Sequence, residues 1–221
     1  MNQLKMINHR DAFEIGEQIR KGKTLILPTD TSYGLCCNAY DQEAVDEVFA
    51  IKGREKNKPL LITVDCMKNA KKHLLWTATI DKLTKKYWPG PLTIVSKCVN
   101  QMFANGIVNE NGEVAVRMPA HKMFRKIIAM TYRPVVATSA NLSGEPEIFD
   151  SKEAFKIFSE RVIYPNAVMN FGKISKNIPT TMIRVDVMTD EITILRQGKI
   201  IPNLDLNKMQ RYFGRFVKKK V

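Results

Sequence analysis

The chain has 221 residues, of which 44% are hydrophobic, and a formal net charge of +13 at pH 7. This length suits one domain with a proper core. No apolar run approaches the roughly 20 residues that span a bilayer, and the N-terminus lacks a signal-peptide core, so we expect a cytoplasmic protein with no membrane partner. The four cysteines show no zinc-ligand spacing, so we expect no protein-bound metal. The charge favours polyanionic partners without identifying them.

Two amphipathic helices and one buried strand are predicted in the first quarter of the chain. Asp11 to Arg20 has apolar residues at helical spacing. Thr24 to Leu27 is typical of a buried strand, and Pro28 to Gly34 of a hydroxyl-rich turn. A second helical pattern begins at Asp41, a suitable N-cap, and stops at Gly53, a suitable C-terminal glycine.

Short strands alternate with another helix in the rest of the chain. Apolar spacing predicts a helix over residues 121–131. Strands are predicted at residues 60–64, 92–95, 114–118, 135–137, 181–187 and 191–195. This alternation favours an α/β or α+β domain with a mixed, twisted β-sheet flanked by helices.

Two pairs of polar residues, each at positions i and i+2, form a candidate ligand site. Lys52 and Arg54 make the first pair, and Ser139 and Asn141 make the second. Two fixed positive charges beside a hydroxyl and an amide suit an anion with several oxygens, such as a phosphate or a carboxylate. From these residues alone two alternatives stay open: the cations complement a helix dipole, and the second pair forms an Asx or ST turn.

Further motifs occur in order around these pairs. They are Pro28-Thr29-Asp30-Thr31-Ser32-Tyr33-Gly34, Lys52-Gly53-Arg54, Lys58-Pro59-Leu60, Trp88-Pro89-Gly90-Pro91, Val116-Arg117-Met118-Pro119, Thr138-Ser139-Ala140-Asn141-Leu142-Ser143-Gly144, Pro179-Thr180-Thr181 and Leu195-Arg196-Gln197-Gly198. With this ordered set, residues 10 to 200 closely resemble the YrdC-like family of threonylcarbamoyl-adenylate synthases, in its short single-domain type.

The resemblance implies a fold and a set of site residues. The fold is an open α/β sheet curved around a large central cavity, with a catalytic domain over residues 1–205 and a basic tail over 206–221. Catalysis is assigned to Lys52, Arg54, Ser139 and Asn141. Contacts with ATP and threonine are assigned to Thr31, Tyr33, Lys58, Arg117, Ser143, Thr180, Thr181 and Arg196, with Thr31 and Tyr33 facing L-threonine. For Lys58 and Arg117, ordinary surface charge is the open alternative.

The activity that the resemblance implies joins L-threonine, bicarbonate and ATP to give threonylcarbamoyl-AMP and pyrophosphate. This is the first step of N6-threonylcarbamoyladenosine (t6A) formation in tRNA, and a separate tRNA threonylcarbamoyl transferase complex would take the product. Mg²⁺ would accompany ATP without a dedicated protein site. ATP binding is implied by the resemblance alone, because neither common glycine-rich phosphate motif occurs in the chain.

Two positions depart from the family's usual residues, and both bear on amino-acid selectivity. Glu55 follows Lys-Gly-Arg where many members have Pro, and Thr63 lies near a position where some have a His that helps to position threonine.

Two other functions compete with the synthase interpretation. One is a non-enzymatic RNA-binding module of the same fold, motivated by the net charge and by the aromatic and basic residues of the segment 211–220, which also leave direct tRNA contact open. The other is carbamoyl transfer from carbamoyl phosphate, which is disfavoured because the zinc-binding and acylphosphatase-like parts of such proteins are absent. A serine hydrolase is not expected, because Ser139 has no nucleophile-elbow motif.

Overall fold

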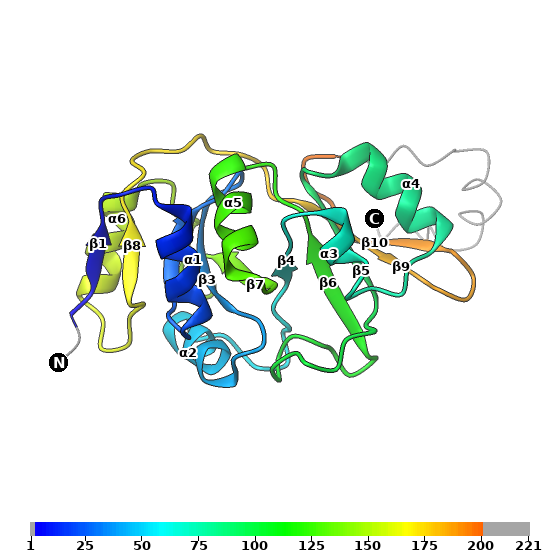
Figure 1. Ribbon diagram of the computed structural model, residues 1–221, viewed down its shortest axis with the longest axis horizontal. Coiled ribbons are helices and arrows are strands. Elements are labelled where there is room, and N and C mark those ends of the chain that lie inside the picture. Colours follow the sequence, from blue (N-terminus) through cyan, green and yellow to red (C-terminus); the bar gives the residue numbers. More distant parts are fainter. Residues whose placement is uncertain (1–2, 201–221) are drawn as a thin grey trace, which may run out of the picture.

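A single ten-stranded β-sheet organises the computed structural model, which describes residues 3–200 (Figure 1). The strand order is β1-β8-β2-β3-β7-β4-β6-β5-β9-β10. The strands are β1 (Lys5–Ile7), β2 (Leu25–Pro28), β3 (Tyr33–Asn38), β4 (Ile62–Thr63), β5 (Leu92–Lys97), β6 (Glu113–Arg117), β7 (Val135–Ser139), β8 (Ala167–Met169), β9 (Thr181–Val185) and β10 (Ile192–Arg196).

Both strand directions occur in the sheet. β8 is parallel to β1 and β2, β4 is parallel to β6, and β5 is parallel to β9. The remaining neighbours are antiparallel. The predicted mixed sheet is confirmed.

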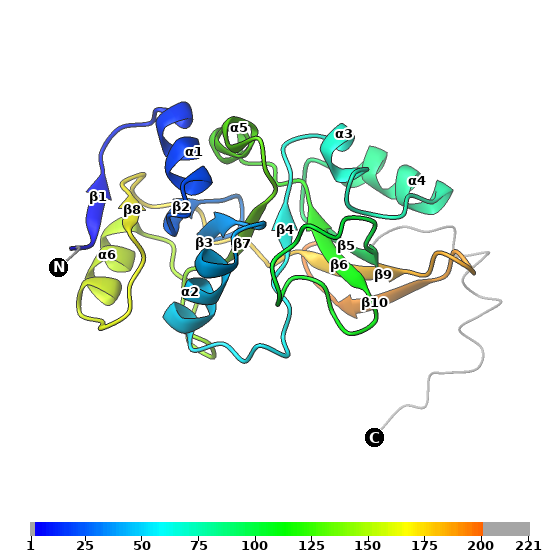
Figure 2. The same cartoon turned by 60° about the horizontal axis from the view of Figure 1, so that its bottom comes forward.

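Helices cover both faces of this sheet. Figure 2 shows α1, α3, α4 and α5 above the strands and α2 and α6 below them. The helices are α1 (Ala12–Arg20), α2 (Gln42–Lys52), α3 (Met67–Ala70), α4 (Ala78–Tyr87), α5 (Lys122–Thr131) and α6 (Ser151–Ser159). Coverage on two sides explains why β2 is apolar and buried along its whole length.

Two hydrophobic clusters pack against the sheet, and β2 contributes to both. Leu25 and Leu27 pack in the cluster that contains the buried residues of α1 and α5, whereas Ile26 faces the larger cluster, which includes residues of α2 and α6. All three are fully buried. Because successive side chains of β2 point to opposite faces, this strand packs against helices on both sides of the sheet.

The first two predicted helices are confirmed, including their ends. Asp11 caps α1 and Asp41 caps α2, each with a side chain that accepts hydrogen bonds from backbone amides of the first turn. α2 ends at Lys52 because Gly53 adopts a left-handed conformation with φ of 58°, which glycine tolerates without a steric cost. Lys52 and Arg54 consequently lie at the carboxyl end of α2.

Two predicted segments need correction. The turn expected over residues 28–34 occupies only 29–32, because Pro28 ends β2 while Tyr33 and Gly34 begin β3, which pairs with β2 and β7. The strand expected over residues 60–64 is limited to Ile62–Thr63, where β4 pairs with β6 and β7. The elements β1, β3, β8, α3, α4 and α6 were not predicted.

The predicted basic tail over residues 206–221 lies outside the described residues, and so does its boundary at residue 205. Within residues 3–200, none of the helices has the length and apolar character to cross a membrane.

Candidate functional site

The two polar pairs singled out in the sequence meet at the carboxyl end of α2. The Nζ atom of Lys52 donates to the carbonyl oxygens of Ser139, at 2.5 Å, and Asn141, at 2.7 Å, and lies 3.4 Å from Oδ1 of Asn141. The backbone amide of Ser143 donates to the Lys52 carbonyl at 3.0 Å. Residues almost 90 positions apart in the chain thus form one unit.

Lys52 supports the loop after β7 rather than projecting freely into solvent. Its side chain is only 3% exposed, and its ammonium donors point at loop carbonyls. Burial, and to a smaller extent nearby Arg54, lower the pKa of Lys52 to about 8 against the opposing effect of Glu147. The ammonium is therefore a titratable group near neutral pH.

The Arg54 side chain holds the segment that follows α2 through two hydrogen bonds to backbone carbonyls. Its Nε donates to the carbonyl of Lys58 at 2.8 Å and its Nη2 to that of Pro59 at 3.1 Å. Lys58 is exposed and forms an ion pair with Glu55 at 3.1 Å, so the alternative of a surface charge fits its position. Burial lowers the Arg54 pKa, yet a guanidinium keeps its charge at physiological pH.

Two adjoining pockets share Arg54 and Ser139. The first, of about 350 Å³, is lined by strands from the middle and the β10 end of the sheet and includes Thr31, Arg54, Arg117, Ser139, Thr180 and Arg196. The second, of about 310 Å³, is lined by Lys52, Gly53, Arg54, Glu55, Lys58, Ser139, Asn141, Ser143 and Gly144. Both volumes are in the range of small-molecule sites, whereas the large central cavity stays a prediction.

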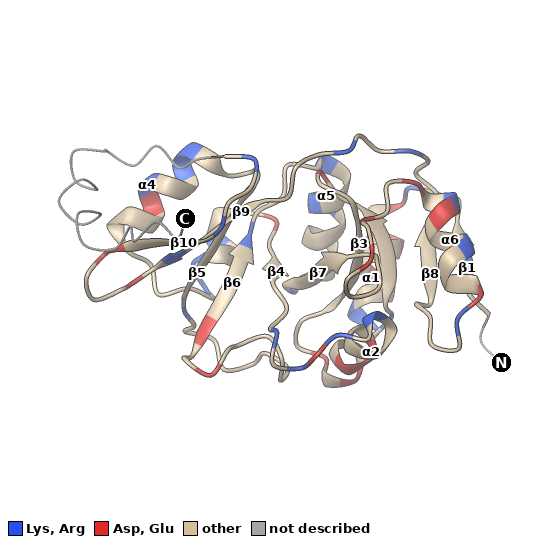
Figure 3. Ribbon diagram, turned by 180° about the vertical axis from the view of Figure 1, so that it is seen from behind, with Lys and Arg blue, Asp and Glu red and all other residues tan. Residues whose placement is uncertain are grey.

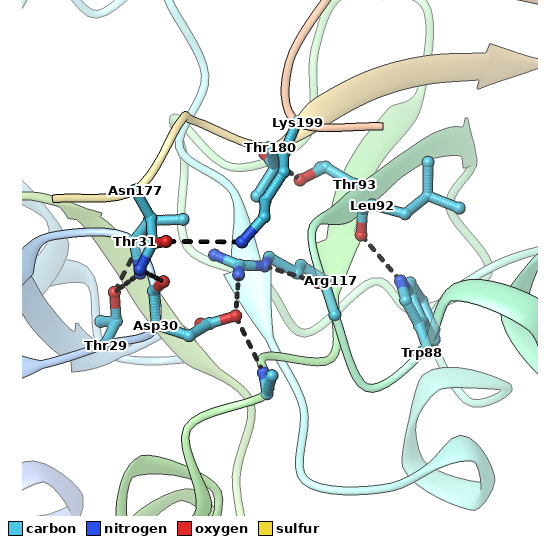
Figure 4. A network of polar contacts seen from close by, with 12 residues as sticks. Thr29, Asp30, Thr31, Trp88, Leu92, Thr93, Arg117, Asn177, Thr180 and Lys199 are labelled. Carbon is cyan, nitrogen blue, oxygen red and sulfur yellow. Dashed lines mark hydrogen bonds and ion pairs between the residues drawn. The ribbon is translucent and has the colours of Figure 1, made fainter. Parts of the chain in front are cut away.

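Arg117 stands in the wall of the first pocket and is paired with Asp30 (Figure 4). Its Nη2 lies 2.6 Å from Oδ2 of Asp30, and its Nε donates to the Gly90 carbonyl at 3.1 Å. The same Asp30 oxygen accepts the Ala120 amide at 3.1 Å. Arg117 is 6% exposed, so the alternative of an ordinary surface charge is wrong for this residue.

Arg196 and Thr180 form another part of the wall of the first pocket. The Arg196 guanidinium donates to the Thr180 carbonyl through Nε, at 3.2 Å, and Nη2, at 3.1 Å, and Nη2 also lies 2.9 Å from the Thr180 hydroxyl. Thr93 bonds the same hydroxyl at 2.9 Å. These contacts join β10 to the segment that enters β9.

Close packing at Gly198 maintains this wall. A Cβ atom there would lie 2.3–2.4 Å from backbone atoms of Pro179, Thr180 and Thr181, which cannot move independently. Gly198→Ala is expected to destabilise the fold by about 1–3 kcal/mol and to displace Arg196. Urea unfolding measures the loss, with Lys199→Ala as the neighbouring control. Equal stability of Gly198→Ala and the wild type would contradict this close approach.

Tyr33 and Thr181 lie outside the lining of both pockets. The Tyr33 side chain is fully buried, and its hydroxyl donates to the Gly172 carbonyl at 2.7 Å. The Thr181 hydroxyl accepts the amides of Gly198, at 3.0 Å, and Ile200, at 3.2 Å. Thr31 does line the pocket, with its hydroxyl 3.1 Å from that of Thr29. The expected contacts of Tyr33 and Thr181 with substrate stay predictions.

The two departures from the family pattern have different surroundings. Glu55 is exposed and paired with Lys58 at the second pocket. Thr63 is buried and lines the first pocket, and its hydroxyl donates to the Val135 carbonyl at 2.8 Å. The Thr63 hydroxyl is thereby engaged within the protein, and it links β4 to β7.

Sequence reasoning missed two carboxylates of the site. Asp30 lies inside a quoted motif, but only the fold reveals its pairing with Arg117. Glu147 lies just beyond the Ser-Gly of another motif and lines the first pocket. Within residues 3–200, no group of three His, Cys, Asp or Glu side chains is arranged to hold a metal ion.

Positive charge is spread over the fold. Figure 3 shows lysine and arginine on α4, α5 and α6 as well as at the end of α2. Two of the cations lie over aromatic rings, Arg10 at 4.3 Å from the centroid of Phe171 and Lys176 at 5.6 Å from that of Phe149. This distribution singles out no one element as a polyanion-binding surface.

Comparisons with a family model and with individual known proteins point to the same family. A model of the Sua5/YciO/YrdC family, described as telomere recombination, matches residues 17–198. The threonylcarbamoyl-AMP synthase of Pyrococcus abyssi is 33% identical over 202 residues, which make up 89% of this chain and 55% of that protein. A putative threonylcarbamoyl-AMP synthase of Methanocaldococcus jannaschii is 33% identical over 184 residues, or 83% of this chain and 84% of that protein.

The fold is similar as well. The crystal structure of P. abyssi Sua5 complexed with L-threonine superposes with a TM-score of 0.77 at 30% identity, covering 96% of this chain and 61% of that one. The chain therefore spans somewhat more than half the length of the P. abyssi protein, and most of the M. jannaschii one.

Proposed function

The chain belongs to the Sua5/YciO/YrdC family, and from this premise we propose that it is an L-threonylcarbamoyladenylate synthase, a nucleotidyltransferase that uses L-threonine, bicarbonate and ATP. The names of the P. abyssi and M. jannaschii relatives support this activity. The observation that carries the proposal is the contact between Lys52 and the loop of Ser139 and Asn141, beside a pocket walled by arginines.

The proposed reaction has two steps. The threonine nitrogen bonds to the carbon of bicarbonate and water is lost, which gives N-carboxythreonine. An oxygen of the new carboxylate then attacks the α-phosphorus of ATP, the bond from that phosphorus to the bridging oxygen breaks, and pyrophosphate leaves. Mg²⁺ arrives with ATP as part of this substrate, and the product passes to a tRNA threonylcarbamoyl transferase complex for t6A formation.

The side chains of the site suit the charge that develops in the second step. Negative charge grows on the leaving pyrophosphate, and preorganised cations stabilise it more than water does. Arg54 borders both pockets, and Lys58 and Ser143 extend the second pocket, which suits the phosphate chain. The Ser139 hydroxyl makes no hydrogen bond within residues 3–200, so it is available to a ligand.

A basic limb is expected in the pH profile. The kcat/KM for ATP should fall as the pH rises through about 8, because kcat/KM reports groups of the free enzyme and Lys52 loses its charge above its pKa. In Lys52→Arg this limb should move to higher pH, since a guanidinium keeps its proton. A limb at the same pH in both proteins would contradict the assignment to Lys52.

The proposal is tested by pyrophosphate release from ATP and bicarbonate with each common amino acid in turn. We expect release that requires both threonine and bicarbonate. If no amino acid stimulates release by the folded protein, the synthase proposal fails, and a non-enzymatic RNA-binding module becomes the favoured hypothesis. That module should bind tRNA with an affinity that falls steeply with salt and survives Lys52→Ala.

A further inference from the structure

The charged side chains that line the first pocket are almost all engaged within the protein. They comprise four arginines and two glutamates: Arg54, Glu113, Arg117, Glu147, Arg184 and Arg196. Arg54 and Arg196 donate to backbone carbonyls, and Arg117 pairs with Asp30. At the far end, Glu113 lies 3.2 Å from Arg184 and accepts a hydrogen bond from Asn109 at 2.9 Å.

Glu147 is the exception. In the part of the chain that the structure describes, its carboxylate has neither a hydrogen bond nor an ion pair, although it lines the pocket. Burial raises the pKa of Glu147, and nearby Arg196 and Lys52 oppose that shift. Among the described residues neither cation forms an ion pair with Glu147, and both are bonded elsewhere, Lys52 to the loop of Ser139 and Arg196 to Thr180.

The backbone holds Glu147 firmly at the pocket. The next residue, Ile148, is 2% exposed, and its carbonyl accepts the amide of Tyr33 at 2.9 Å. This bond ties the segment to the first residue of β3. A half-buried carboxylate without a partner is unfavourable in the free protein, and a bound cationic group would offset that cost.

The chemistry of the substrates identifies that cationic group. ATP and bicarbonate are anions, which Glu147 repels, whereas threonine carries an α-ammonium group beside its carboxylate. We propose that Glu147 binds the α-ammonium group of the amino-acid substrate, an inference that rests on the proposed synthase function. The arginines of the same pocket are then left for the anionic groups, so that the protein binds both the ammonium and the carboxylate of the zwitterion.

The test compares the kinetics of Glu147→Gln with those of the wild type. The KM for threonine is expected to rise roughly 10- to 100-fold, as for the loss of a hydrogen bond to a charged group, while the KM for ATP does not rise. Glu147→Asp keeps the charge and should recover part of the affinity. Glu145→Gln, an exposed glutamate two residues away that lines neither pocket, is the matched control.

A ligand that lacks the amine tests the contact between Glu147 and the α-ammonium group separately from the rest of the site. The compound 2,3-dihydroxybutanoate has a hydroxyl in place of the threonine amine, and its inhibition constant should be the same in the wild type and in Glu147→Gln. A merely structural effect of the substitution would weaken both ligands.

Acidic pH should mimic the substitution. The KM for threonine of the wild type should rise as the pH falls through the raised pKa of Glu147, because protonation removes the charge. Lys52 and Arg196 are the charged groups that act on Glu147, and Lys52, with a pKa of about 8, stays protonated in this range. Glu147→Gln should lack this dependence.

The outcomes separate the two proposals. If the wild type turns over threonine and Glu147→Gln keeps the wild-type KM for threonine, the role of Glu147 is overturned and the synthase function stands. If the wild type shows no threonine-dependent release of pyrophosphate, both fall.

Discussion

Lys52→Met is expected to lower the rate of pyrophosphate release by roughly 10²- to 10³-fold while the protein stays folded, as for the loss of one preorganised charge at a reacting group. Methionine keeps the buried aliphatic stem but removes the ammonium that donates to the carbonyls of Ser139 and Asn141. The loop then loses its anchor and the site its charge. Steady-state kinetics with an unfolding curve for each protein make the measurement.

Lys56→Met is the control for this prediction. Lys56 lies in the same segment, but it is exposed, and its one ion pair among residues 3–200 is with Asp46 at 2.7 Å. Its substitution should leave turnover and stability near wild-type values. Comparable turnover in Lys52→Met and Lys56→Met would remove Lys52 from the site.

Asp30→Ala should destabilise the fold by about 3–5 kcal/mol, because it leaves the buried guanidinium of Arg117 without its counter-charge. For a chain of this size, that loss corresponds to a fall in Tm of roughly 6 to 20 °C. The Ala120 amide also loses its acceptor. Thermal unfolding measures the effect, and the freed Arg117 should reduce turnover as well.

Asp46→Ala provides the comparison, since Asp46 forms an ion pair of nearly the same length with an exposed lysine. There the expected loss is at most about 1 kcal/mol. A loss for Asp30→Ala no greater than that for Asp46→Ala would show that burial does not strengthen the Arg117 pair.

Helices with clear end signals could be predicted from the sequence. Asp11 and Asp41 cap helices because their side chains reach amides only a few residues away, and Gly53 ends one through its own backbone conformation. Such signals involve only residues that are close in the sequence, so they can be recognised without knowledge of the fold. The strands over residues 92–97 and 113–117 follow for a similar reason, since turn residues precede them.

Three strands without such signals were missed. β3 contains Gly34 and Asn38 and follows a hydroxyl-rich turn, so its composition favours a loop, but pairing with β2 on one side and β7 on the other makes it a central strand. β1 and β8 are three residues long and hold together by pairing with distant segments. Tertiary pairing, which no local pattern encodes, decided these elements.

The sequence predicted which residues belong to the candidate site but not what each of them does there. The two i, i+2 pairs do meet, yet only the folded chain reveals that Lys52 holds the loop of Ser139 and that Asp30 holds Arg117. Both facts depend on contacts between residues more than 80 positions apart. Glu147 escaped notice because its lack of a partner is a property of three-dimensional structure.

The most direct test of the account is to supply ¹³C-bicarbonate, L-threonine and ATP to the protein and to identify the nucleotide product by mass spectrometry. The account predicts an adenylate that contains threonine and carries the ¹³C label in its carbamoyl carbon, with one pyrophosphate for each adenylate. Unlabelled threonyl-adenylate, or no adenylate from the folded protein, would contradict it.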